Sequence, residues 1–135
     1  MTGAFGTPLA APRLAGDPRY RRLVDLTLLA TLVVVIWGGF VRVTGSGLGC
    51  PDWPLCHGQF LPSLDTATQI EWTHRLLALL SGAGIVALVV WTLARYRRDR
   101  AVVTLTVLSG VLYVLQALLG AVTVILELPD TWVTA

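Results

Sequence analysis

Apolar residues gather in three long runs that are separated by more polar segments. The runs are Leu23–Val41, Trp72–Leu93 and Ala101–Leu126. Each is close to the roughly 20 residues that an α-helix needs to cross about 30 Å of hydrocarbon. The pattern predicts an all-α integral membrane protein with three transmembrane helices. Because three spans make a poor closed bundle, we expect this helical set to be incomplete.

The first run is interpreted as a retained span and not as a cleaved signal peptide. Its apolar core is longer than the roughly 7–15 residues of a signal peptide, and Arg42 follows it directly. Residues 1–20 are rich in Gly, Pro and Ala without apolar periodicity, which predicts a disordered cytoplasmic tail. Residues 21–135 then form the transmembrane region.

Charge is scarce, and its distribution predicts an orientation. Only 13% of the residues are charged, about half of the roughly 25% that soluble domains carry. Basic residues precede the first run and fill the second connection: Arg13, Arg19, Arg21, Arg22, Arg95, Arg97, Arg98 and Arg100. Acidic residues lie at the opposite ends: Asp52, Asp65, Glu127 and Asp130. The positive-inside rule therefore predicts a multi-pass protein of the inner or plasma membrane with a cytoplasmic N-terminus. The net charge of +2 comes from these flanks, so no nucleic-acid partner is expected.

The first connection, about residues 44–68, is expected to be an extracytoplasmic loop that holds Cys50 and Cys56. Disulfides persist outside the cytoplasm, which favours a structural or redox disulfide over two free thiols. Cys56-His57 is not a c-type haem attachment site, because Trp53 stands where C-x-x-C-H requires a cysteine. His57 is interpreted as a loop residue, with transient metal or haem contact as the weaker alternative.

Glu71 and His74 are the candidate chemical residues. Three positions apart on a helix, they share a face and differ by about 4.5 Å in height. A neutral imidazole can bind haem iron, and a neighbouring carboxylate can accept a proton or stabilise a developing cation. In the alternative interpretation, Thr68 is the N-cap and Glu71 completes a capping box. Arg42 and Arg75 suit haem propionates and lipid headgroups equally well.

The third run carries small and polar residues at alternating spacings of four and three. They are Ser109, Tyr113, Gln116, Gly120, Thr123 and Glu127. Such a stripe shares one helix face and is expected to point at other helices or at a bound group, not at lipid.

Four segments together resemble a known family, haem A synthase. They are GGFVRVTGSGL (38–48), CPDWPLC (50–56), EWTHR (71–75) and LQALLGAVTV (115–124). The resemblance covers about residues 37–135, in the family's order, and matches the N-terminal portion of the family.

The resemblance implies two similar four-helix halves, each offering paired histidines to a haem. The three spans of this chain would then be an incomplete four-helix half-bundle. The family oxidises the C8 methyl group of haem O to the formyl group of haem A, for cytochrome c oxidase biogenesis, with haem B as cofactor. Glu71 would be the catalytic carboxylate, His74 an axial ligand of the haem iron, and Cys50–Cys56 the extracytoplasmic disulfide. The implied partners are haem O as substrate, the lipid bilayer, haem O synthase and oxidase assembly factors.

Two other functions stay open at this point. The chain stops just before the family's partner histidine, so missing helices or a second chain would complete the site. One alternative is therefore a non-catalytic haem-binding or oxidase-assembly membrane fragment. The other is a quinone-linked thiol oxidoreductase, although such enzymes use C-x-x-C and the spacing of Cys50 and Cys56 is wider.

Overall fold

The computed structural model describes residues 17–126, and these residues form three long helices. Along the chain they are α1 (Pro18–Val43), α2 (Thr66–Arg95) and α3 (Arg100–Ile125). All three are long and apolar enough to cross a membrane. The described part of the chain contains no β-strand, so the predicted all-α membrane architecture is confirmed. Residues 1–16 of the predicted tail, and Glu127 in the third-run stripe, lie outside the described residues.

Each helix follows an aspartate and begins before its apolar run. Asp17, Asp65 and Asp99 are the N-caps, and their side chains accept hydrogen bonds from backbone N–H groups of the first turn. A capping carboxylate satisfies donors that a helix start otherwise leaves unpaired. As a result α1 begins at Pro18 and α2 at Thr66, several residues before Leu23 and Trp72.

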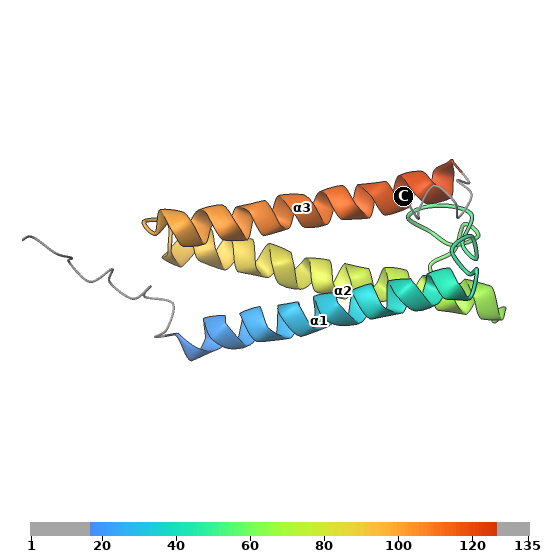
Figure 1. Cartoon of the computed structure of the whole chain (residues 1–135), viewed down its shortest axis with the longest axis horizontal. Coiled ribbons are helices and arrows are strands. Elements are labelled where there is room, and N and C mark those ends of the chain that lie inside the picture. The colour runs from blue at the N-terminus through green and yellow to red at the C-terminus, as the bar shows by residue number, and fades with distance from the viewer. Residues whose placement is uncertain (1–16, 127–135) are drawn as a thin grey trace, which may run out of the picture.

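Helix α2 lies between the other two, as Figure 1 shows, and packs on both. Against α1, the hydroxyl groups of Thr31 and Ser81 are hydrogen-bonded at 2.8 Å. Tyr20 and Thr92 form a second hydroxyl pair at 2.8 Å near the N-terminal end of α1. Small and hydroxyl-bearing residues let helices approach closely in a membrane, where apolar side chains gain nothing by leaving lipid.

The burial pattern agrees with lipid as the surrounding solvent. Thr27, Ser81 and Thr92 are buried between the helices, whereas most of the large leucine and valine side chains are exposed. This is the reverse of a soluble core, in which apolar side chains lie inside.

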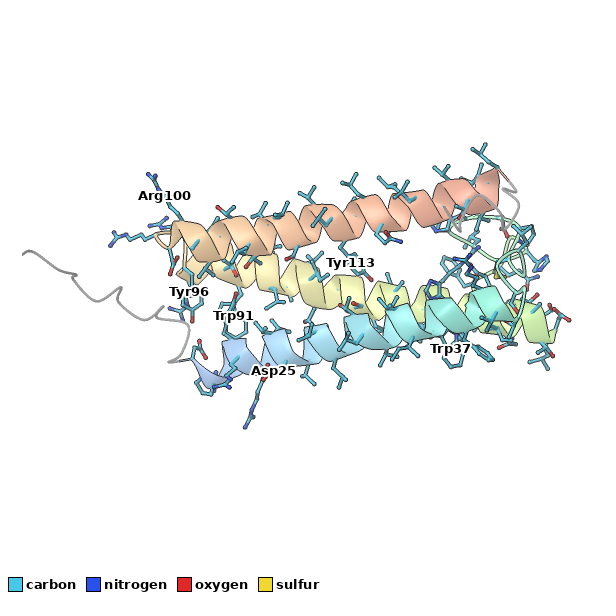
Figure 2. The ribbon with its side chains drawn as sticks, viewed as in Figure 1. Asp25, Trp37, Trp91, Tyr96, Arg100 and Tyr113 are labelled. Carbon is cyan, nitrogen blue, oxygen red and sulfur yellow. A yellow bond between two sulfur atoms is a disulfide. The ribbon has the colours of Figure 1, made fainter. Side chains whose placement is uncertain are left out.

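The polar stripe of α3 faces α2 only in part. The Tyr113 hydroxyl donates a hydrogen bond to the Ala78 carbonyl of α2, and Figure 2 shows this side chain directed from α3 towards α2. Ser109 and Gln116 are exposed, and a Cβ atom at Gly120 would meet nothing within 4 Å in the described structure. A bound group or another helix beside Gln116 therefore stays a prediction.

Packing between α1 and α2 depends on Gly84. A Cβ atom at this position would lie 2.6 Å from Oγ1 of the buried Thr27. We expect Gly84→Ala to lower stability by about 1–3 kcal/mol through overpacking, although alanine favours helix by about 1 kcal/mol. Thermal unfolding in detergent, followed by circular dichroism, measures the change. Gly120→Ala is the matched control and should be neutral or stabilising; an equal loss in both variants would contradict the packing account.

Candidate functional site

A disulfide closes the loop between α1 and α2. Cys50 and Cys56 are bonded, with an S–S distance of 2.00 Å and a Cα–Cα distance of 4.7 Å. The two residues are 0% and 1% exposed. The disulfide favoured from the sequence is therefore present, and it lies inside the segment that we call the cysteine loop, residues 44–65.

Side chains in the first turns of α2 donate hydrogen bonds to the cysteine loop. Three of these bonds reach loop carbonyls: Thr68 Oγ1 to Gly49 O at 2.8 Å, Gln69 Nε2 to Ser63 O at 2.8 Å, and Trp72 Nε1 to Phe60 O at 2.9 Å. Gly49 itself lies so close to α2 that a Cβ atom there would be 2.6 Å from the Ala67 carbonyl carbon. The loop is thus seated on α2 at close range.

Arg75 makes the most extensive of these contacts. Its Nη1 donates to the carbonyl oxygens of Asp52 at 2.6 Å and Leu55 at 2.8 Å, and its Nη2 donates to that of Cys50 at 2.8 Å. Its Nε donates to Glu71 Oε1 at 2.9 Å. The guanidinium is directed at protein oxygens, and its pairing with a haem propionate or a lipid headgroup stays a prediction.

Glu71 is buried, with 6% of its surface exposed, and does not cap its helix. The N-cap of α2 is Asp65, whose side chain accepts a hydrogen bond from the Thr68 backbone. The capping-box interpretation of Thr68 and Glu71 was therefore wrong. Because Asp65 starts the helix earlier, Glu71 lies beyond the first turn, where its carboxylate pairs with Arg75.

His74 lies one helical turn from Glu71 and packs against α1 at a glycine. A Cβ atom at Gly38 would be 3.0 Å from His74 Cε1, so the glycine leaves space for the imidazole. The ring nitrogen Nδ1 is buried and has no hydrogen-bond partner in the described structure. A buried unpaired polar atom costs about 1–3 kcal/mol and calls for a functional explanation.

These residues fit one side of a haem site. A haem brings four iron ligands of its own, so a protein needs to add only axial ligands such as histidine. His74 could supply one such ligand, because its Nδ1 is unpaired and Gly38 leaves space for its ring. Across residues 17–126 no group of three or more His, Cys, Asp or Glu side chains is placed to hold a metal ion. One histidine is enough for an axial haem ligand, so haem binding by His74 stays a prediction.

The remaining predicted residues lie around this region. Arg42 is in the last turn of α1, and its pairing with a propionate stays a prediction. His57 is a loop residue, with its Nε2 3.1 Å from the Gly49 carbonyl oxygen. Trp37 donates a hydrogen bond from Nε1 to the Ile70 carbonyl at 3.1 Å, joining α1 to α2 beside Glu71.

Two features of the site were not predicted. The signal for the space that Gly38 leaves for His74 is a glycine at the same membrane depth on another span. It can be recognised only when the packing of α1 against α2 is already known. The carbonyl oxygens around Arg75 leave no sequence signal, because every residue carries one.

Asp52 holds the turn that follows the disulfide. Its Oδ1 accepts the His57 N–H at 2.6 Å and its Oδ2 accepts the Gly58 N–H at 2.7 Å. Gly58 has a φ of +70°, which glycine adopts without strain. The hydrogen bonds from Gly58 and His57, with the nearby Arg75 charge, lower the pKa of the exposed Asp52 carboxyl group, although partial desolvation opposes them. The carboxylate form therefore stabilises the loop.

Comparison with known proteins gives a consistent result. The model of a family described as cytochrome oxidase assembly protein matches residues 21–134. A protein named Heme A synthase from Bacillus licheniformis is 44% identical over 101 residues, covering 74% of this chain and 33% of the relative. The Heme A synthase of Bacillus pumilus is 41% identical over 107 residues, covering 78% and 35% respectively. The chain thus spans about a third of the length of these relatives.

The lowered pKa of Asp52 predicts an acid-sensitive loop. A carboxyl group whose pKa falls on folding stabilises the folded state above its usual value of 3.8, and this contribution is lost as the pH falls through the lowered pKa. We expect reduction of Cys50–Cys56 by a phosphine, which remains active in acid, to accelerate below about pH 3.8. Asp52→Asn should show fast reduction at neutral pH and no such acceleration. An identical pH profile in the two proteins would refute this account.

Proposed function

This chain belongs to the cytochrome oxidase assembly protein family, and from that membership we propose that it forms part of a haem A synthase. The proposed reaction oxidises the C8 methyl group of haem O to the formyl group of haem A. The name of its relatives supports this reaction, and the observation that carries it is the buried, unpaired Nδ1 of His74 one turn from a buried carboxylate.

Each residue of the site has a role in the proposal. His74 would hold the haem iron, and Arg42 would pair with a propionate. The Glu71 carboxylate accepts a proton or stabilises positive charge at the substrate edge. Haem B, the proposed cofactor, supplies redox-active iron when bound. Haem O synthase and oxidase assembly factors are the proposed protein partners.

The proposed site faces the outer side of the inner or plasma membrane. Arginines flank the end of the bundle opposite the cysteine loop: Arg19, Arg21, Arg22, Arg95, Arg97, Arg98 and Arg100. Such residues stay on the cytoplasmic side, which supports a cytoplasmic N-terminus and an extracytoplasmic cysteine loop. Glu71 and His74 then lie near the outer surface of the membrane.

The structure bears differently on the two competing functions. A thiol oxidoreductase exchanges its disulfide rapidly with substrate thiolates, whereas the almost complete burial of Cys50 and Cys56 slows such exchange. A non-catalytic haem-binding fragment is the stronger competitor, since Glu71 would then serve only to pair Arg75. The test of the proposal must therefore separate a catalytic Glu71 from a structural one.

Replacement of Glu71 in a chimera provides this test. The chain replaces the matching third of the Bacillus licheniformis relative, and haem A is measured by chromatography of extracted haems. We expect Glu71→Gln to lower haem A formation by about 10²–10⁴-fold, the usual contribution of acid–base catalysis. Asp65→Asn is the matched control, because it removes another carboxylate of α2 while asparagine still caps a helix. Normal haem A levels in the Glu71 variant would show that the carboxylate is not catalytic.

Haem binding by His74 is tested at the glycine behind its ring. Gly38→Val should displace the imidazole and weaken haem binding by about 5–150-fold, which corresponds to an overpacking cost of about 1–3 kcal/mol. The adjacent Gly39→Val is the control, because a Cβ atom at Gly39 meets nothing within 4 Å in the described structure. Absorbance titration of the detergent-solubilised chain with haem measures both affinities. Equal affinities would argue against His74 as the ligand.

A further inference from the structure

The three carbonyl groups that bind Arg75 share one covalent ring. Cys50, Asp52 and Leu55 all lie within the segment closed by the Cys50–Cys56 disulfide, whose cysteines are six positions apart. We call residues 50–56 the carbonyl ring. A closed ring has far fewer conformations than an open chain, so it can hold several carbonyl groups in one orientation. The guanidinium matches this arrangement, because it offers five N–H donors in a rigid plane.

The same guanidinium also binds Glu71. Its Nε–H donates to Glu71 Oε1 at 2.9 Å, and the two side chains are only 14% and 7% exposed. Hydrogen bonds between charged groups are shorter and stronger than neutral ones, and burial limits competition from water. Arg75 is therefore a physical link between the carbonyl ring and the Glu71 carboxylate.

We propose that Arg75 is a positioning residue, which fixes the Glu71 carboxylate by fastening it to the carbonyl ring. The orientation of Glu71 then depends on the Cys50–Cys56 bond. A dithiol reductant converts this disulfide to two thiols and is itself oxidised to a disulfide, so two electrons and two protons pass to the cysteines. The opened ring no longer aligns its three carbonyl groups, and Arg75 and Glu71 lose their fixed geometry together. This inference deepens the proposed function and rests on it only where Glu71 acts in catalysis.

The composition of the chain allows a direct test of this linkage. The sequence contains two glutamates, Glu71 and Glu127, so Glu127→Gln leaves Glu71 as the sole glutamate side chain. With a carbon-13 label in that carboxyl group, infrared spectroscopy of the chain in detergent reports its hydrogen bonding without any haem. We expect dithiothreitol to shift the labelled carboxylate band. A band that does not respond to reduction would overturn the proposal.

Substitution of Arg75 identifies the link. In Arg75→Lys the labelled band should already be displaced and should no longer respond to dithiothreitol, since an ammonium group cannot span Glu71 and three carbonyl groups. Arg95→Lys, the same change at the opposite end of α2, should keep the parental response. Circular dichroism confirms that each variant remains helical, and Arg75→Gln provides a second substitution if lysine prevents folding. A parental band and parental response in both Arg75 variants would refute the proposal.

Reciprocity supplies an independent measurement. If the disulfide holds Arg75 in place, then Arg75 must stabilise the disulfide by the same coupling. We expect Arg75→Lys to favour reduction by about tenfold in the thiol–disulfide equilibrium constant, measured by alkylation in dithiothreitol redox buffers. An unchanged equilibrium constant would contradict the proposed coupling.

The chimera connects this linkage to catalysis. There, Arg75→Lys should lower kcat for haem O by about 10–100-fold with little change in KM, because a displacement near 1 Å can cost about 10²-fold. A chimera in which neither form makes haem A contradicts the proposed function, while the infrared and redox measurements still decide the role of Arg75. Parental kcat in an active Arg75→Lys chimera contradicts the positioning role.

Discussion

A guanidinium buried in a membrane protein needs hydrogen-bond acceptors for its N–H groups. Arg75 finds them in the cysteine loop and in Glu71, and these bonds hold the loop against α2. An arginine costs about 2.5–3.5 kcal/mol at the centre of a membrane span and less towards its ends; Arg75 lies nearer the start of α2. Arg75 recovers this cost through three loop carbonyls and the Glu71 carboxylate. The cysteine loop therefore folds back over α2 instead of extending into water. Its position, in turn, keeps Glu71 buried beside His74.

The helices provide the frame for this arrangement by a different kind of contact. Hydroxyl groups and glycines lie between α1 and α2, as at Thr31, Ser81 and Gly84. Close approach of the two helices brings Gly38 against the His74 ring. Within the described residues, α2 packs on both neighbours, and it also carries Glu71, His74 and Arg75. Stability and chemistry are thus concentrated on the same helix.

The sequence predicts the spans well and the site less completely, for identifiable reasons. The apolar runs reveal the helices, because lipid imposes a simple length and composition. The pattern Thr68-x-x-Glu71 also predicts a capping box. Asp65, an equally good cap three residues earlier, starts the helix instead. The surroundings of Arg75 and His74 depend on backbone carbonyls and on a glycine from another helix. Neither leaves a local pattern, so only the folded chain reveals them.

The size of the carbonyl ring has a consequence for natural variation in this region. Inserting or deleting one residue between Cys50 and Cys56 would change which carbonyl groups face α2, so the contacts that Arg75 now makes would be lost. We therefore expect the cysteine spacing and the residue at position 75 to vary together in evolution, although 19 positions separate Cys56 from Arg75. In a relative without the two cysteines, no closed ring would hold carbonyl groups for the guanidinium of Arg75. Loss of the cysteines and loss of this arginine are therefore expected together.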